Sequence, residues 1–201
     1  MHYVELIGTA VFAITGVLAV TRRGLDVIGA LMLGVVTALG GGTVRDTLIR
    51  APIFWFGDLN YVWAAILGAL AAFWIGSVFR STFRALLYLD GLGAALFAIT
   101  AAHKVLVLDF PGPVAVMMGV LTGIGGGLLR DVLAGRPTLL MSREIYATPI
   151  LLGCTAFVVL QLIPAASGYA ETAGVAIIFG VRALAIHQHL EMPEWLTHRE
   201  N

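Results

Sequence analysis

The sequence matches itself when it is shifted by 85 residues, and this internal repeat limits the possible folds more than any other feature. The glycine triplet at residues 40–42 then coincides with the triplet at 125–127, and each triplet is followed by the same Arg-Asp pair. Other matches are Gly8 with Gly93, Phe12 with Phe97, Thr37 with Thr122, Pro52 with Pro137, and Tyr61 with Tyr146. Unrelated apolar helices share leucines and valines by chance, but not glycines, charges and prolines in register. We interpret the chain as an internal duplication.

The chain is too apolar for a water-soluble domain. Hydrophobic residues make up 59% of it and charged residues 12%, with a mean hydropathy of +0.94, whereas soluble domains average about 25% charged residues. A helix needs about 20 apolar residues to cross the hydrocarbon core. Runs that meet this need lie near Tyr3–Val20, Val27–Leu48, Tyr61–Phe79, Ala85–Ala102, Pro113–Leu133, Ile145–Ile163 and Tyr169–Ile186. The connectors are too short for a soluble domain, so neither an enzyme nor catalytic residues are expected.

Each copy of the repeat contains three of these spans, and an odd number inverts the second copy in the membrane. The expected fold is an all-α integral membrane protein of seven transmembrane helices, built as two inverted three-helix repeats plus a seventh helix. Repeat one covers about residues 3–80, repeat two about 85–165, the seventh helix about 169–188, and a cytoplasmic tail 189–201. Many transport proteins place their pathway between inverted repeats.

Basic residues collect on one side of the predicted membrane. That side receives Arg22, Arg23, Arg80, Arg84, Arg136, Arg143 and Arg199, and the other receives Arg50 and Lys104. The positive-inside rule predicts an external N-terminus and a cytoplasmic C-terminus. The formal net charge is zero, which does not favour nucleic-acid binding.

The two glycine triplets are the first candidates for a pathway. Each interior glycine costs a helix up to about 1 kcal/mol relative to alanine, so three in succession are expected to kink or unwind the segment. Freed backbone groups must then be buried or line a wet cavity; the alternative is that the glycines only permit close helix packing. The pore and kink candidates are Gly40, Gly41, Gly42, Gly125, Gly126, Gly127, Thr15, Thr37, Thr100 and Thr122. The threonines offer hydroxyls to an ion, or they bond to their own helix.

Charged residues beside the triplets are the second group of candidates. They are Arg45, Asp46, Arg130 and Asp131, together with Glu5 and Asp90, which are equivalent to each other by the repeat. Charges at such depth usually face a bundle interior or water. We expect the ion pairs Glu5–Arg45 and Asp90–Arg130, which act either in gating or only in structural charge neutralisation. His187 and His189 lack a third ligand nearby and are interpreted as a polar helix end, with no metal site expected.

Paired Gly-Gly-Gly-x-x-Arg-Asp segments in a three-plus-three-plus-one arrangement resemble the prokaryotic trimeric intracellular cation (TRIC) channels, a bacterial family also labelled a glycine transporter domain. The segment at residues 143–149 is similar to that family's start of the sixth span. The resemblance implies a homotrimer in a prokaryotic inner membrane, in contact with lipid. It also implies one pore per protomer, lined by kinked second and fifth helices and conducting K⁺ and Na⁺, with no cofactor beyond the permeant ion.

Animal members of that family bind a phosphoinositide through a Lys-Glu-Val motif. The one lysine here, Lys104, is followed by Val105, so phosphoinositide binding is not expected. A secondary transporter of glycine or a similar small solute is the alternative function, since an unwound glycine segment can cradle a carboxylate. A non-conducting membrane scaffold is the third class, and the symmetric buried charges argue against it.

Overall fold

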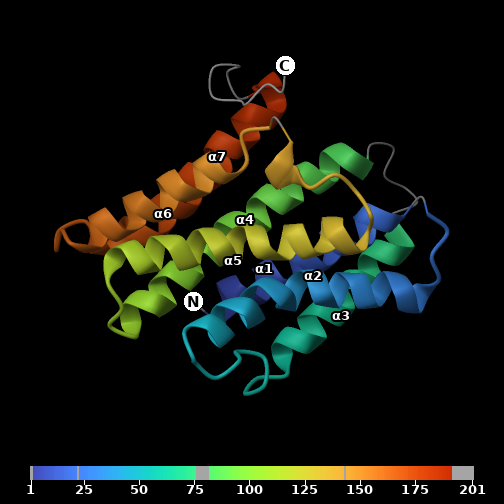
Figure 1. Cartoon of the computed structure of the whole chain (residues 1–201), viewed down its shortest axis with the longest axis horizontal. Helices are drawn as coiled ribbons and strands as arrows, with labels where there is room; N and C mark the ends of the chain where they lie inside the picture. Colours follow the sequence, from blue (N-terminus) through green and yellow to red (C-terminus); the bar gives the residue numbers. More distant parts are fainter. Residues whose placement is uncertain (1, 22, 76–81, 143, 192–201) are drawn as a thin grey trace, which may run out of the picture.

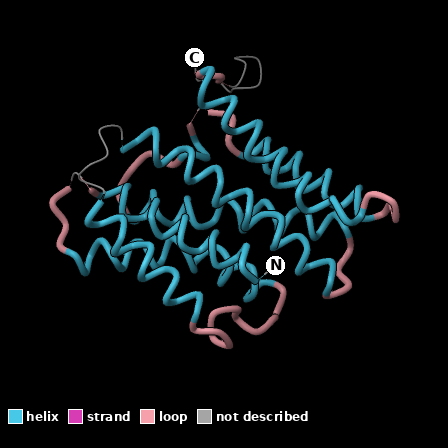
Figure 2. Tube along the Cα trace, turned by 180° about the vertical axis from the view of Figure 1, so that it is seen from behind, coloured by secondary structure: helices cyan, strands magenta, loops and turns pink. Residues whose placement is uncertain are grey.

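The structure is a computed structural model that describes all residues except 1, 22, 76–81, 143 and 192–201. Seven α-helices occupy the described residues (Figures 1 and 2): α1 (His2–Val20), α2 (Val27–Leu48), α3 (Asn60–Ile75), α4 (Thr82–Val107), α5 (Gly112–Leu133), α6 (Ala147–Gln161) and α7 (Ala170–Gln188). Two short 3₁₀ helices, η2 (Leu139–Met141) and η3 (Ser167–Tyr169), lie in connectors. The expected all-α fold is therefore confirmed. Arg22, Arg80, Arg143, Arg199 and the tail beyond residue 191 lie outside the described residues.

The helices are those of a multi-pass membrane protein. Five of those in the described residues, α1, α2, α4, α5 and α7, are long and apolar enough to span a membrane. The other two, α3 and α6, are apolar but have 16 and 15 residues. A short helix spans a bilayer when the membrane thins or flanking residues reach the interface.

The two halves fold alike down to their helix ends. After α2, the carbonyls of Arg45 and Asp46 accept the amides of residues 49 and 51; after α5, those of Arg130 and Asp131 accept the amides of residues 134 and 136. The segments after α2 and after α5 then both turn through the left-handed region, at Arg50 and at Gly135, each with a φ of 55°. Glycine takes this conformation without the Cβ strain that Arg50 bears.

The two halves meet around a pair of equivalent phenylalanines. The rings of Phe12 in α1 and Phe97 in α4 stack with centroids 5.3 Å apart and an interplanar angle of 17°. Gly93 lies against Phe12, and its equivalent Gly8 lies against Phe97. Beside them, α2 and α5 lie side by side and run in opposite directions (Figure 1). These reciprocal contacts are those expected of inverted halves that face each other.

The seventh helix belongs to one half only. It packs mainly against α4 and α6, and at one end His103 of α4 lies 2.8 Å from Glu171 of α7. Among the described residues, no helix takes the equivalent place beside repeat one.

Candidate ion pathway and its charge clusters

The glycine triplets do not interrupt their helices. Residues 27–48 and 112–133 are α-helical throughout, so these segments are not unwound, and the expected kink stays a prediction. The physical reason lies in the packing of α2 on α5. A Cβ added to Gly41 would lie 2.7 Å from the carbonyl oxygen of Thr122, and one added to Gly126 would lie 2.5 Å from that of Thr37. The backbones touch here, so these two glycines serve the close packing that was the alternative interpretation.

Of the remaining four triplet glycines, three face side chains and one faces backbone. Gly40 lies under Leu129, and Gly125 lies against the Cα of Gly41. A Cβ on Gly42 would meet the ring of Phe54 at 2.6 Å, whereas one on the equivalent Gly127 would lie 2.9 Å from both an Asp90 oxygen and the Tyr146 hydroxyl. The space next to the last glycine is therefore apolar in repeat one and polar in repeat two.

All four candidate threonines are buried and bond to their own helices. Their hydroxyls donate to carbonyl oxygens three or four residues earlier: Thr15 to Phe12 at 2.8 Å, Thr37 to Leu33 at 2.6 Å, Thr100 to Phe97 at 3.3 Å, and Thr122 to Met118 at 2.7 Å. A hydroxyl that donates one bond still has lone pairs to offer. These contacts satisfy the donors without removing the acceptors.

A group of three charged residues lies at the end of α2: Arg45 and Asp46 of α2 and Lys104 of α4, which we call the Lys104 cluster. One oxygen of Asp46 accepts from Arg45 Nε and from Lys104 Nζ, each at 2.8 Å, and the other accepts the amide of Phe54 at 2.9 Å. The Arg45 guanidinium also lies 5.7 Å from the Phe54 ring. Two cations here share one carboxylate.

A group with the opposite charge balance lies at the end of α5: Arg130 and Asp131 of α5 and Asp90 of α4, which we call the Asp90 cluster. Arg130 donates to Asp90 at 2.6 Å and to Asp131 at 2.9 Å, and the second Asp131 oxygen accepts the amide of Leu139 at 3.2 Å. The Asp90 and Arg130 side chains are fully buried. The contact expected between Asp90 and Arg130 is present, and two carboxylates here share one guanidinium.

The ion pair expected between Glu5 and Arg45 is not formed. Glu5 instead accepts from the Tyr61 hydroxyl at 2.5 Å, and Arg45 turns to Asp46 and to the face of Phe54. The partner of Arg45 is therefore its neighbour in sequence.

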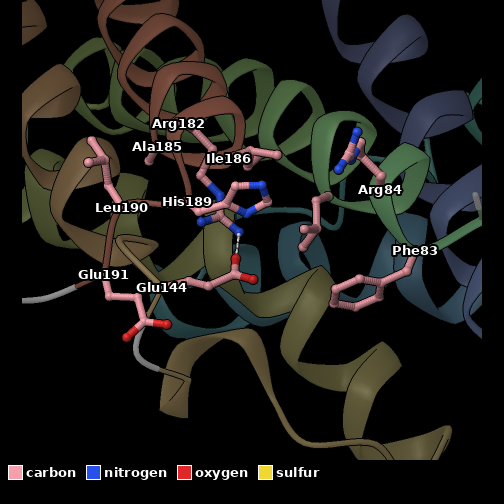
Figure 3. A pocket seen from close by; sticks show the side chains of 10 residues that line it. Phe83, Arg84, Glu144, Arg182, Ala185, Ile186, His189, Leu190 and Glu191 are labelled. Carbon is pink, nitrogen blue, oxygen red and sulfur yellow. Dashed lines mark hydrogen bonds and ion pairs between the residues drawn. The ribbon is translucent and has the colours of Figure 1, made fainter.

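Two basic residues of the site were missed by sequence reasoning. Lys104 was used to predict the membrane orientation and the absence of phosphoinositide binding, but not as a partner for a buried charge. Arg182 was overlooked, although a single charge inside an apolar span is itself a signal of a buried partner. Arg182 is 2% exposed and lies 2.8 Å from Glu144. The pair forms part of the wall of a pocket of about 300 Å³ between the start of α4 and the end of α7 (Figure 3).

Neither histidine of the His-x-His sequence contributes to a metal site in the described part of the chain, where no group of three His, Cys, Asp or Glu side chains is placed to hold an ion. His189 ends α7 in the left-handed conformation, with a φ of 52°, and lines the pocket shown in Figure 3.

An inverted repeat with a buried charge cluster at each end of the α2–α5 crossing defines a membrane protein built like a transport protein. The family model described as glycine transporter matches residues 2–77 and 87–162, two stretches offset by the same 85 positions as the repeat. The inner membrane protein YadS of Escherichia coli (strain K12) is 37% identical over 199 residues, which cover 96% of this chain and 95% of that protein.

Solved structures of TRIC channels have the same fold. The trimeric intracellular cation channel orthologue from Rhodobacter sphaeroides matches with a TM-score of 0.90 and 39% identity, over 94% of this chain and 97% of that one. A prokaryotic TRIC channel crystallised in 0.5 M KCl matches with a TM-score of 0.87 and 25% identity, over 94% and 96% of the two chains. The chain belongs to the prokaryotic TRIC channel family, whose family model carries the glycine transporter description.

Proposed function

We propose that this protein is a cation channel that conducts K⁺ and Na⁺ as a homotrimer, with one pathway per protomer along α2 and α5. The observation that carries the proposal is the similarity over nearly the whole chain to the Rhodobacter sphaeroides TRIC channel orthologue. We place it in a prokaryotic inner membrane, as for the related YadS, with the N-terminus outside. The Lys104 cluster then faces the outer side and the Asp90 cluster the cytoplasm.

The Asp90 cluster makes cation passage compatible with a buried arginine. Arginine stays protonated at any accessible pH, so a bare guanidinium would repel a cation in a narrow path. Arg130 contacts two carboxylates within 3 Å, which offset its charge. Arg45 shares the Asp46 carboxylate with Lys104, so the Lys104 cluster keeps one positive charge.

The threonine hydroxyls supply the remaining polar surface along the path. Thr37 and Thr122 lie at the α2–α5 crossing, where their carbonyl oxygens contact the facing glycines. The crossing is too tight for a hydrated ion between the helices, so conduction along it requires α2 and α5 to separate or kink at Gly41 and Gly126. Glycines without side chains permit this movement at little steric cost.

Planar-bilayer recording of the purified protein tests the proposal. We expect unitary currents in KCl and in NaCl, and a trimer by light scattering of the detergent-solubilised protein. A folded trimer that gives no unitary current in either salt would contradict the channel.

A carrier of glycine or a similar small solute is the second candidate, and the description of the matching family model favours it. Proteoliposomes loaded with buffer and exposed to labelled glycine separate the two functions. Saturable glycine uptake without unitary currents would replace the channel with the carrier, whereas currents without uptake would exclude glycine as the substrate.

A further inference from the structure

A groove of about 460 Å³ lies on the outside of the helix bundle, where the end of α1, the start of α2 and the end of α5 meet. Figure 1 shows that α2 begins and α5 ends at the same end of the molecule. The large apolar side chains that line the groove are Val20, Leu25, Met32, Leu33, Val36 and Leu133. Leu25, Met32 and Leu133 are 45%, 57% and 61% exposed, so the groove is open to the surroundings of the bundle.

The groove is about as deep as one leaflet of a membrane. It begins at Arg23, just after the end of α1, and follows α2 as far as Val36. From Val27 to Val36 the helix rises by about 14 Å, at about 1.5 Å per residue. Half of the hydrocarbon core measures about 15 Å. The apolar wall therefore extends from the level of the lipid head groups almost to the centre of the membrane.

Two arginines lie at the head-group end of the groove, and each reaches across to the other half of the protein. Arg23, in the connector after α1, donates from Nη2 to the carbonyl oxygen of Gly135 at 3.2 Å. Arg136, in the segment after α5, donates from Nη1 to the carbonyl oxygen of Ala19 at 3.1 Å. The Arg136 guanidinium also lies 5.4 Å from the centre of the Phe83 ring. These contacts hold both arginines at the same end of the bundle.

Neither Arg23 nor Arg136 pairs with a carboxylate within the described residues. The carbonyl contacts leave the other N–H donors of each guanidinium available. The pKa of Arg136 is lowered by burial; the charges of Arg130 and Arg23 add to this effect and Asp131 opposes it. Asp131 is itself bound to Arg130 at 2.9 Å. One end of an apolar groove thus carries positive charge without an acidic partner.

The repeat provides an internal comparison, because the equivalent place at the other end of the molecule lacks this pair. At the 85-residue offset, Arg23 corresponds to Leu108 and Arg136 corresponds to Ala51. A different arginine, Arg50, follows α2, but it stands at another position of the repeat. The combination of an apolar groove with these two arginines therefore belongs to one side of the membrane.

We propose that this groove binds a phospholipid with an anionic head group, whose acyl chain lies along α2 and whose phosphate contacts Arg23 and Arg136. Guanidinium groups match the geometry of phosphate oxygens. Basic pockets between transmembrane helices on the cytoplasmic side bind anionic head groups, and this is the cytoplasmic side in the proposed topology. The lipid ties the two halves together at this end, because its phosphate contacts one arginine from each half.

Photocrosslinking of the full-length protein in phosphatidylcholine liposomes tests the proposal. The probes are phosphatidylglycerol and phosphatidylcholine with the same diazirine-labelled acyl chain, and mass spectrometry locates the labelled peptides. We expect phosphatidylglycerol to label residues 20–36 and 133–134 at least about fivefold more than phosphatidylcholine, the factor that corresponds to one arginine near an anionic head group. Equal labelling by the two probes would overturn the proposal. So would a groove that neither probe labels, since a second copy of the chain would then cover it.

The face around Met117 is the matched control in the same experiment. Met117 is the repeat equivalent of Met32 and is likewise 57% exposed, but it lies at the end without the arginine pair. Both probes should label it equally. An equal preference for phosphatidylglycerol around Met32 and Met117 would show that the lipid follows the general charge of the surface, and the proposal would fail.

Variants separate the head group from the chain. Arg23→Gln/Arg136→Gln should abolish the preference of the groove for phosphatidylglycerol. Arg84→Gln, which changes an arginine that lines the other pocket, should retain the preference. Val36→Phe should lower the labelling of the groove by both probes, because the ring fills its deep end. Equal effects of the two arginine substitutions would contradict the assignment of the phosphate site.

Competition distinguishes a lipid from a free anion. Excess unlabelled phosphatidylglycerol should displace the probe, whereas inorganic phosphate at the same concentration should not, since it has no chain to occupy the groove. Displacement by inorganic phosphate would assign the arginines to a free anion and refute the lipid. The comparison of the two probes uses the parent protein, so a variant that fails to fold does not protect the proposal. None of these readouts requires conduction, so they are independent of the channel proposal.

Discussion

In the Asp90 cluster one guanidinium bridges two carboxylates, so its members differ in what their removal costs. Asp90→Asn removes the negative charge from the 2.6 Å contact and weakens it, because an amide oxygen is a poorer acceptor than a carboxylate, but it leaves Arg130 bound to Asp131. A hydrogen bond to a charged group contributes about 1.5–3 kcal/mol, so we expect the free energy of unfolding to fall by about 2 kcal/mol. Arg130→Met instead strands two buried carboxylates, and breaking a buried pair in this way costs about 3–5 kcal/mol.

The double variant Asp90→Asn/Arg130→Met measures the pair itself. It leaves only Asp131 charged, which keeps the amide of Leu139, so the double loss should be smaller than the sum of the single losses by about 2 kcal/mol. Steric trapping in lipid bicelles measures the free energy of unfolding of each single variant and of the double variant.

The equivalent cycle in repeat one is the matched control. Glu5 and Arg45 do not pair in the structure, and Glu5 is bound to Tyr61. The Glu5→Gln and Arg45→Met losses should therefore add to within about 0.5 kcal/mol. Additive losses in the Asp90 cycle, or strong coupling in this control, would refute the assignment of partners.

Three further predictions concern Lys104, the α2–α5 crossing and the membrane topology. Lys104→Met should lower the free energy of unfolding by about 1 kcal/mol or less, since Asp46 keeps its arginine and the lysine is partly exposed; thermal unfolding measures it, and a loss of several kcal/mol would contradict the reasoning. Gly126→Ala should destabilise the α2–α5 crossing by about 1–3 kcal/mol and reduce the unitary current, whereas Gly180→Ala, which meets open space, should do neither; equal effects would contradict the packing argument. A reporter that works only in the cytoplasm should be active when it is fused after Asn201, and a silent fusion alongside an active N-terminal one would reverse the topology.

The apolar runs and the 85-residue repeat can be found in the sequence directly, and together they predicted the seven helices and their inverted arrangement. The run at residues 27–48 coincides with α2, and the run at 113–133 differs from α5 by one residue. The structure also brings residues related by the 85-residue offset into contact, as in the Phe12–Phe97 stack. Charged residues deep in apolar helices must find partners, so the involvement of Arg45 and Arg130 was also predictable.

The glycine triplets show where local reasoning stops. A triplet lowers the stability of an isolated helix, but it also lets a second backbone approach, and the sequence does not say which effect prevails. The facing helix decided it: Thr122 O and Thr37 O contact the facing glycines, and both helices stay intact.

The sequence by itself determined the number of helices, their inverted order and the depth of the buried charges, because these follow from apolar length and from an odd number of spans per repeat. Only the tertiary structure decided which acid each arginine takes. That choice depends on how side chains on separate helices meet: Glu5 accepts from Tyr61, whereas Asp90 accepts from Arg130. Equivalent residues thus acquire different partners, because their neighbours are not equivalent.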